Sequence, residues 1–172
     1  MNLAGERALS SFDQRHRFVA SALIESPWKG GSDATMGSRI LAGFELAPIV
    51  TYGTGRPFNL LTLSDVNSDR HYASDRPLGA PRNSGIGPDF LNLDLRLSRT
   101  VKFGERISAQ LMAEGFNLAN RTNYATVNNL VAANFAPPFN VHGSAAIAPN
   151  QPLDFASAYA KRQIQFGLRL SF

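Results

Sequence analysis

The chain has no cysteine, few charges and no long hydrophobic run. Without cysteine it can form neither disulfides nor thiolate metal sites. Charged residues make up 17% of the sequence, whereas soluble domains average about a quarter. Although 44% of the residues are hydrophobic, no stretch approaches the roughly 18 consecutive apolar residues of a transmembrane helix. The apolar residues alternate with polar ones instead, which is typical of strands that expose every second side chain to lipid.

Two segments alternate strictly with a period of two. In 91–98 every odd position is leucine and every even position is polar. In 163–172 the even positions are large and apolar: Ile164, Phe166, Leu168, Leu170 and Phe172. Successive side chains of a strand point to opposite faces, so each segment forms a strand with one apolar face. Soluble antiparallel sheets show the same pattern, so alternation alone leaves both environments open.

Three weaker segments, 16–26, 39–52 and 106–118, follow the same scheme. Pro48 conflicts with the second, because proline cannot donate to a ladder, and predicts a bulge or strand boundary there. We therefore expect an all-β antiparallel fold with about five transmembrane strands. The predicted strands lie near 16–26, 39–52, 91–101, 106–118 and 162–172.

Alternation also places a set of polar side chains on the face opposite the apolar one. We expect this face to line the water-filled interior of a barrel, with its members pairing with one another rather than binding substrate. Besides Gly43 and Glu45, the residues expected to face the lumen are Asn92, Asp94, Arg96, Gln110, Glu114, Gln165 and Arg169.

The connections between the predicted strands alternate between short and long. The turn at Lys102–Glu105 is tight, whereas 53–90 and 119–161 are loops of about 40 residues. Short periplasmic turns and long external loops are the layout of outer-membrane barrels. Structureless loops of this length are unusual in compact soluble domains. The other short connection, between the predicted strands 16–26 and 39–52, has about a dozen residues. If the last strand ends in the periplasm, both short connections are periplasmic and both long loops are external.

The chemical motifs are weak. Asp65, Asn67 and Asp69 have the alternate spacing of a calcium loop, but arginines stand where its glycine and glutamate belong, so a polar turn-rich loop is favoured. His16, His71 and His142 show no ligand spacing, and no nucleophile motif occurs, so no enzyme and no cofactor is expected. Residues 53–58 lack the lysine of a phosphate loop and are interpreted as a strand-to-loop bend.

The 17 lysines and arginines are scattered along the chain, which argues against nucleic-acid binding despite the net charge of +4. The first 18 residues, MNLAGERALSSFDQRHRF, contain no apolar core and therefore do not resemble a secretory signal. Because an outer-membrane protein needs such a signal, we expect the chain to be a fragment of a longer protein or a truncated reading frame.

Several stretches, in order along nearly the whole chain, resemble the C-terminal barrel region of TonB-dependent receptors, in particular the Oar-like group. They are FDQRHRFVASALIESP, GFELAPIVTYGTGRPFNL, DRP at Asp75–Pro77, GPDFLNLDLRLSRTVKFGERISAQLMAEGFNLANRTNY and the final RQIQFGLRLSF.

This resemblance implies a bacterial outer-membrane barrel of about 22 strands, filled by a plug and driven by the TonB complex, of which this chain supplies roughly the last five strands. The implied partners are lipid, the rest of the barrel, the plug, TonB through a segment outside this chain, and the barrel-insertion machinery. That machinery would recognise Ile164, Phe166, Leu168, Leu170 and Phe172 as an assembly signal. The alternative is a soluble β-sandwich or lectin-like module, which would remain dispersed without detergent.

Overall fold

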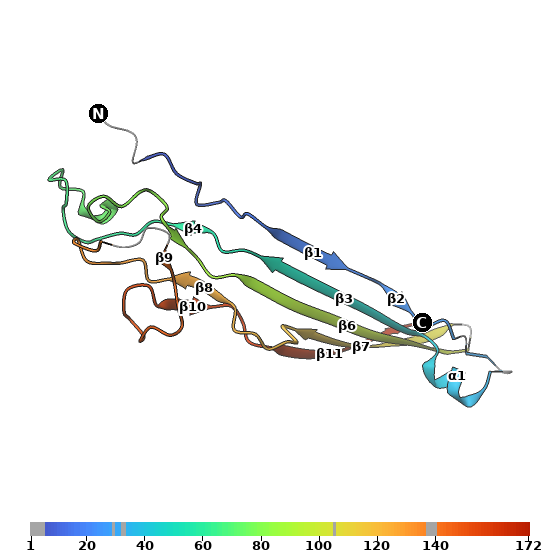
Figure 1. Ribbon diagram of the computed structural model, residues 1–172. Helices are drawn as coiled ribbons and strands as arrows, with labels where there is room; N and C mark the ends of the chain where they lie inside the picture. The colour runs from blue at the N-terminus through green and yellow to red at the C-terminus, as the bar shows by residue number, and fades with distance from the viewer. Residues whose placement is uncertain (1–5, 29, 32–33, 105, 137–140) are drawn as a thin grey trace. The chain divides into compact units, whose positions relative to one another are not determined.

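The computed structural model describes residues 6–28, 30–31, 34–104, 106–136 and 141–172, which form two units (Figure 1). The wall unit comprises residues 18–51, 91–121 and 160–172, and the loop unit comprises residues 6–17, 52–90 and 122–159. The secondary structure is almost entirely antiparallel β, which confirms the predicted fold class. Among the described residues, no helix combines the length and the hydropathy needed to cross a membrane.

One sheet forms the wall unit. Its strands are β1 (Arg17–Ser21), β2 (Ile24–Glu25), β3 (Phe44–Gly53), β6 (Phe90–Phe103), β7 (Ile107–Phe116) and β11 (Gln163–Ser171). The order is β1-β3-β6-β7-β11, and β2 pairs with β3 as the continuation of β1. Each wall strand therefore lies beside the wall strand that precedes it along the chain, as in an antiparallel meander.

The register aligns the alternating side chains across strands. Leu97 lies opposite Ala113, which in turn lies opposite Phe166, so an apolar row crosses β6, β7 and β11. This row is open to solvent at Phe166, whose exposed fraction is 82%. The buried apolar residues among the described part of the chain are Leu60, Ala80 and Val131, and all three belong to the loop unit. No apolar core covers the described face of the wall sheet.

Pro48 lies opposite the gap between β1 and β2. It lies inside β3, and its carbonyl oxygen accepts a hydrogen bond from the N–H of Ala22, in the gap between β1 and β2. Because proline has no N–H, the return bond of the ladder is missing at this point. The predicted strand boundary therefore falls on the neighbouring strand rather than on β3 itself.

The predicted strand 39–52 is wrong at its beginning. Residues Met36–Leu41 form helix α1, and β3 starts at Phe44. Thr35 caps the helix, because its side chain accepts from the N–H of Ser38. Gly43 then has a φ of +76°, which glycine adopts readily, and its carbonyl oxygen accepts from the N–H of Thr100. This local cap and turn override the short alternation around Ile40.

The two long connections, expected only as loops, contain short elements of secondary structure. They carry β4 (Pro57–Phe58), β5 (Gly85–Ile86), β8 (Tyr124–Val127), β9 (Val141–His142), β10 (Phe155–Ala158) and the short helix η2 (Tyr72–Ser74). Strands β4, β5 and β9 form one small sheet, in which β5 and β9 are parallel, and β8 pairs with β10. The Tyr124 and Phe155 rings stack with centroids 4.0 Å apart. Thus the loop unit has its own packing.

The predicted tight turn is shorter than expected. Strand β6 continues to Phe103 and β7 begins at Ile107, so only three residues connect them. Gly104 has a φ of +71°, and Glu105 lies outside the described residues.

Replacement of Gly55 by alanine should destabilise the loop unit. A Cβ at this position would lie 1.8 Å from the carbonyl oxygen of Gly87, so the two backbone segments would have to separate. We expect Gly55→Ala to cost about 1–3 kcal/mol of unfolding free energy, as for other overpacked sites. Gly37→Ala is the matched control, because nothing lies within 4 Å of its added Cβ and alanine favours its helix. Denaturant unfolding measures both variants, and equal stabilities would refute the close approach.

Candidate functional site

Polar side chains on the face opposite the apolar row form a connected group. Arg96, Glu114 and Gln165 lie opposite one another on β6, β7 and β11. Arg96 Nε is 3.2 Å from Glu114 Oε1, and Gln165 Nε2 donates to Glu114 Oε2. The ion pair is partly exposed, so it contributes at most about 1 kcal/mol to stability.

A second group lies at the beginning of β6 and the end of β7. Asn92 Nδ2 donates to Asp94 Oδ1 over 2.8 Å, and the same oxygen accepts from the backbone N–H of Asn117 over 3.0 Å. Asn117 has a φ of +49° and directly follows the last residue of β7. Asp94 therefore holds the turn at which the chain leaves the wall.

The remaining predicted lumen residues share the face without joining these two groups. Gln110 Nε2 donates to Ser98 Oγ over 3.5 Å, and Gln110 lies opposite Arg169 in the register. The register thus brings together the side chains that alternation assigned to one face. That this face lines a lumen remains a prediction.

Sequence reasoning missed two features of the wall. Glu25 lies directly opposite Glu45 on the polar face, so two like charges are adjacent, an arrangement that destabilises a strand pair. Arg99 occupies a position of the apolar row, where β6 otherwise presents leucine, valine and phenylalanine. The odd-position alternation of 91–101 carries the signal for Arg99, because it is the only charged residue in that series.

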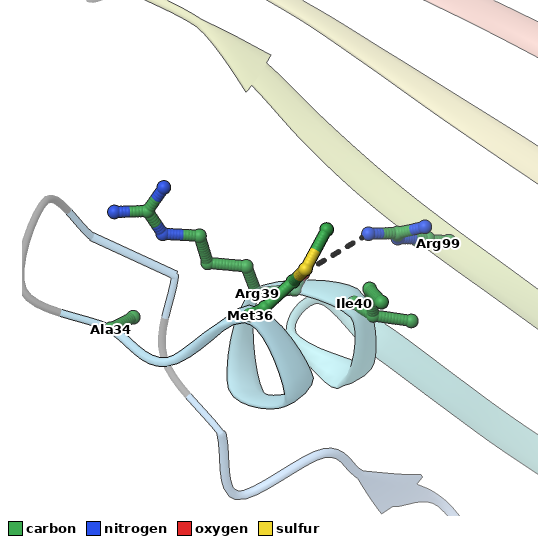
Figure 2. A pocket seen from close by; sticks show the side chains of 5 residues that line it. All are labelled: Ala34, Met36, Arg39, Ile40 and Arg99. Carbon is green, nitrogen blue, oxygen red and sulfur yellow. Dashed lines mark hydrogen bonds between the residues drawn. The ribbon is translucent and has the colours of Figure 1, made fainter.

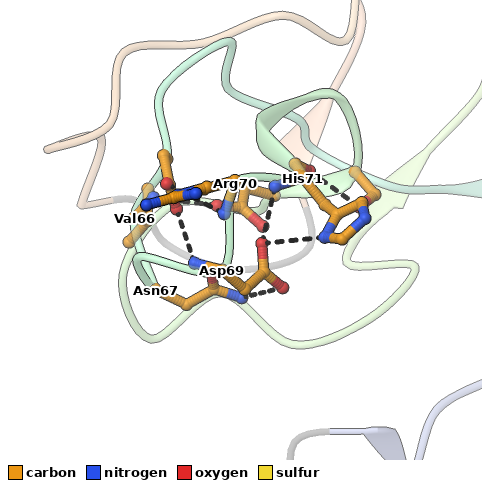
Figure 3. A network of polar contacts seen from close by, with 8 residues as sticks. Val66, Asn67, Asp69, Arg70 and His71 are labelled. Carbon is orange, nitrogen blue, oxygen red and sulfur yellow. Dashed lines mark hydrogen bonds and ion pairs between the residues drawn. The ribbon is translucent and has the colours of Figure 1, made fainter.

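The predicted calcium loop is closed by its own carboxylates (Figure 3). Asp65 accepts hydrogen bonds from the N–H groups of Asp69 and Arg70, at 3.1 and 3.0 Å. Asn67 Nδ2 donates to Asp69 Oδ2 over 2.9 Å. The two bonds to Asp65 are the side-chain-to-backbone bonds of polar turns, whereas the bond from Asn67 to Asp69 joins two side chains.

The third carboxylate near this loop is Asp75, which the sequence spacing did not identify. Oxygens of Asp65, Asp69 and Asp75 lie within 4.8 Å of one another. Asp75 is buried, and its Oδ2 accepts from the N–H of Val66 over 2.8 Å. Because backbone donors already engage these carboxylates, the geometry is that of a stabilised polar turn, and calcium binding at Asp65, Asn67 and Asp69 stays an untested alternative.

The last wall strand presents the predicted assembly residues on one face. Ile164, Phe166, Leu168 and Leu170 lie opposite Gly115, Ala113, Leu111 and Ala109. All four are exposed, and Phe172, which follows the strand, is 100% exposed. In the described sheet β11 is the edge strand, with β7 as its neighbour on one side.

Comparison with protein families finds one matching model, described as an outer membrane beta barrel domain. It matches residues 1–81 and again residues 76–165, which together cover most of the chain. Neither the curated proteins nor the solved structures contain a match.

Acidification should loosen the loop around Asp69. The N–H of His71 is the main cause of the lowered pKa of Asp69, and the Asn67 amide adds to it. A lowered pKa means that the charged form contributes stability, which is complete above roughly pH 3.9 and is lost as the pH falls through the lower folded value. The protection of the His71 amide against hydrogen exchange, taken relative to the intrinsic exchange rate at each pH, should therefore fall as Asp69 becomes protonated. In Asp69→Asn this additional pH dependence should vanish, and its persistence there would refute the assignment.

Proposed function

We propose that this chain, which belongs to the outer membrane beta barrel domain family and is located in the bacterial outer membrane, forms consecutive wall strands of a TonB-dependent receptor of the Oar-like group. The observation that carries the proposal is the wall sheet itself. It is a meander with an exposed apolar row on one face and a polar row on the other, and its described edges are β1 and β11. Such a sheet requires lipid on one side, water on the other and further strands at its edges.

The role proposed for the chain is transport rather than catalysis. The group of Arg96, Glu114 and Gln165 would face the water-filled interior, where the charged side chains stay hydrated. The loop unit would lie outside the cell and take part in ligand capture, and the plug and the TonB-contacting segment would come from the rest of the protein. The soluble β-sandwich is disfavoured, because no second sheet covers the apolar row among the described residues.

Cross-linking to TonB tests the receptor assignment. The full-length protein that contains this chain is expressed in its host, and cross-linked TonB is quantified after purification from the outer membrane. We expect a TonB adduct that disappears in a host lacking TonB. If the protein reaches the outer membrane but never yields this adduct, the receptor assignment is wrong. Its membership of the outer membrane beta barrel domain family would be unaffected.

Substitution of Leu95 tests which face meets lipid. Leu95 lies opposite Gly115, which lies opposite Ile164, so Leu95 belongs to the apolar row. We expect Leu95→Arg to destabilise the membrane-inserted protein by about 2–4 kcal/mol near the middle of the bilayer. Gln165→Arg is the control, because it places the same charge beside Glu114, where the effect should stay below about 1 kcal/mol. Unfolding in lipid vesicles gives both values, and the reverse ranking would exchange the two faces.

Deletion of Phe172 tests the proposed assembly signal. If the insertion machinery recognises the last strand, the deletion should reduce the amount of full-length protein in the outer membrane. Spontaneous folding into pure lipid vesicles should change little. Phe172→Tyr keeps an aromatic ring and serves as the control. Normal abundance of the deletion variant in cells would remove the recognition role, and equally poor folding in vesicles would assign Phe172 to anchoring alone.

A further inference from the structure

Arg99 is a cation in the apolar row of the wall. It lies opposite Leu111, which lies opposite Leu168, and both leucines are exposed. The cost of an arginine on a lipid-facing surface is high at the bilayer centre and almost disappears near the interface. Arg99 is four residues from the end of β6 at Phe103, which places it toward the short-turn end of the wall. Its position is therefore compatible with the headgroup level of a membrane.

The guanidinium of Arg99 is held at this end of the sheet by two contacts. Its Cζ lies 5.0 Å from the centroid of the Phe44 ring, a cation–π geometry. Nη2 donates to the carbonyl oxygen of Arg39 over 3.1 Å, in the last turn of α1. The apolar stem can thus follow the row while the charge reaches a polar environment.

Arg99 and α1 together line an open hollow of about 520 Å³ (Figure 2). The lining residues are Ala34, Met36, Arg39, Ile40 and Arg99. The side chain of Met36 is 81% exposed and that of Ile40 is also exposed, although both are apolar. Arg39 Nε donates to the carbonyl oxygen of Gly31 over 3.1 Å, and Figure 2 shows the side chain of Met36 between the Arg39 and Arg99 guanidinium groups. The hollow therefore has a guanidinium group on either side of aliphatic surface.

This combination matches one class of ligand. Planar guanidinium groups recognise phosphate oxygens through paired hydrogen bonds. The exposed Met36 and Ile40 side chains continue the apolar surface that the wall presents to lipid. A free phosphate ion would use the arginines and leave this aliphatic surface in water, whereas a glycerophospholipid would cover both.

We propose that Arg39 and Arg99 bind the phosphate of a glycerophospholipid, whose acyl chains lie against Met36, Ile40 and the apolar row of the wall. This proposal rests on the proposed function, in which the apolar row faces lipid. In the orientation proposed there, the short-turn end lies on the periplasmic side, so the lipid belongs to the inner leaflet. The site would fix the depth of the wall in the membrane at the end where α1 lies.

Native mass spectrometry of the full-length protein in detergent tests the site directly. Phosphatidylglycerol is the probe, and diacylglycerol with the same acyl chains is the phosphate-free control. The double variant Arg39→Gln/Arg99→Gln should retain roughly 30-fold less phosphatidylglycerol than the wild type. Each arginine near a lipid headgroup contributes about 1 kcal/mol of binding free energy, which corresponds to about fivefold in affinity. Arg96→Gln, on the polar face of the same strand, should retain as much as the wild type. Heat-modifiable electrophoretic mobility verifies that each variant is folded.

Arg39→Lys/Arg99→Lys should recover part of the binding, because the charges remain while the paired hydrogen bonds of the guanidinium groups are lost. The proposal fails if the glutamine pair binds phosphatidylglycerol like the wild type, if diacylglycerol is retained equally well, or if the lysine pair binds no better than the glutamine pair.

Orientation is measured separately, by labelling Ser64→Cys and Lys102→Cys in intact cells with an impermeant reagent. We expect labelling at position 64 alone. Labelling at position 102 would reverse the proposed orientation and thus refute the inner-leaflet assignment, even with phosphatidylglycerol still bound. Conversely, loss of lipid binding with the expected labelling would refute the site and leave the proposed function intact.

Discussion

The antiparallel backbone ladder that joins β6 to β7 and β7 to β11 is the constraint on which the wall depends. Its register places Leu97, Ala113 and Phe166 in one row and Arg96, Glu114 and Gln165 in the next. Because side chains alternate with a period of two, a slip by one residue would bring each polar side chain to the apolar face. The ion pair between Arg96 and Glu114 adds little energy, but the observed register places the two residues directly opposite each other.

This register also explains why the wall has no core of its own. A single sheet with one apolar face must cover that face with another layer or place it in lipid. In the described residues, the buried apolar side chains Leu60, Ala80 and Val131 belong to the loop unit, whereas the wall keeps its apolar row exposed. The loop unit thus buries a few apolar side chains of its own, whereas the exposed apolar row of the wall suits a lipid environment. The charged Arg99 is an exception in the apolar row, and it lies near the end of β6 that leads into the short turn.

Prediction from sequence succeeded where a strand's own alternation determines the structure and failed where other contacts do. The leucines of 91–97 and the apolar series of 164–170 identify β6 and β11 without knowledge of their neighbours. Around Ile40 a few alternating residues suggested a strand, but the Thr35 cap and the positive φ of Gly43 favour a helix and a turn. In the long connections, short strands such as β4 and β5 have too few residues to show any period.

By itself the sequence determined that the chain is antiparallel β, which strands are amphipathic and which side chains share a face, because period-two alternation is a property of each strand alone. Only the tertiary structure decided which of those side chains meet. These contacts join segments that are separated along the chain. Arg96 pairs with Glu114, and Glu25 lies opposite Glu45. Asp75 lies near Asp65, and Arg99 packs beside Phe44 and α1. Such contacts follow from the register and from backbone turns, which bring together residues that no local spacing relates.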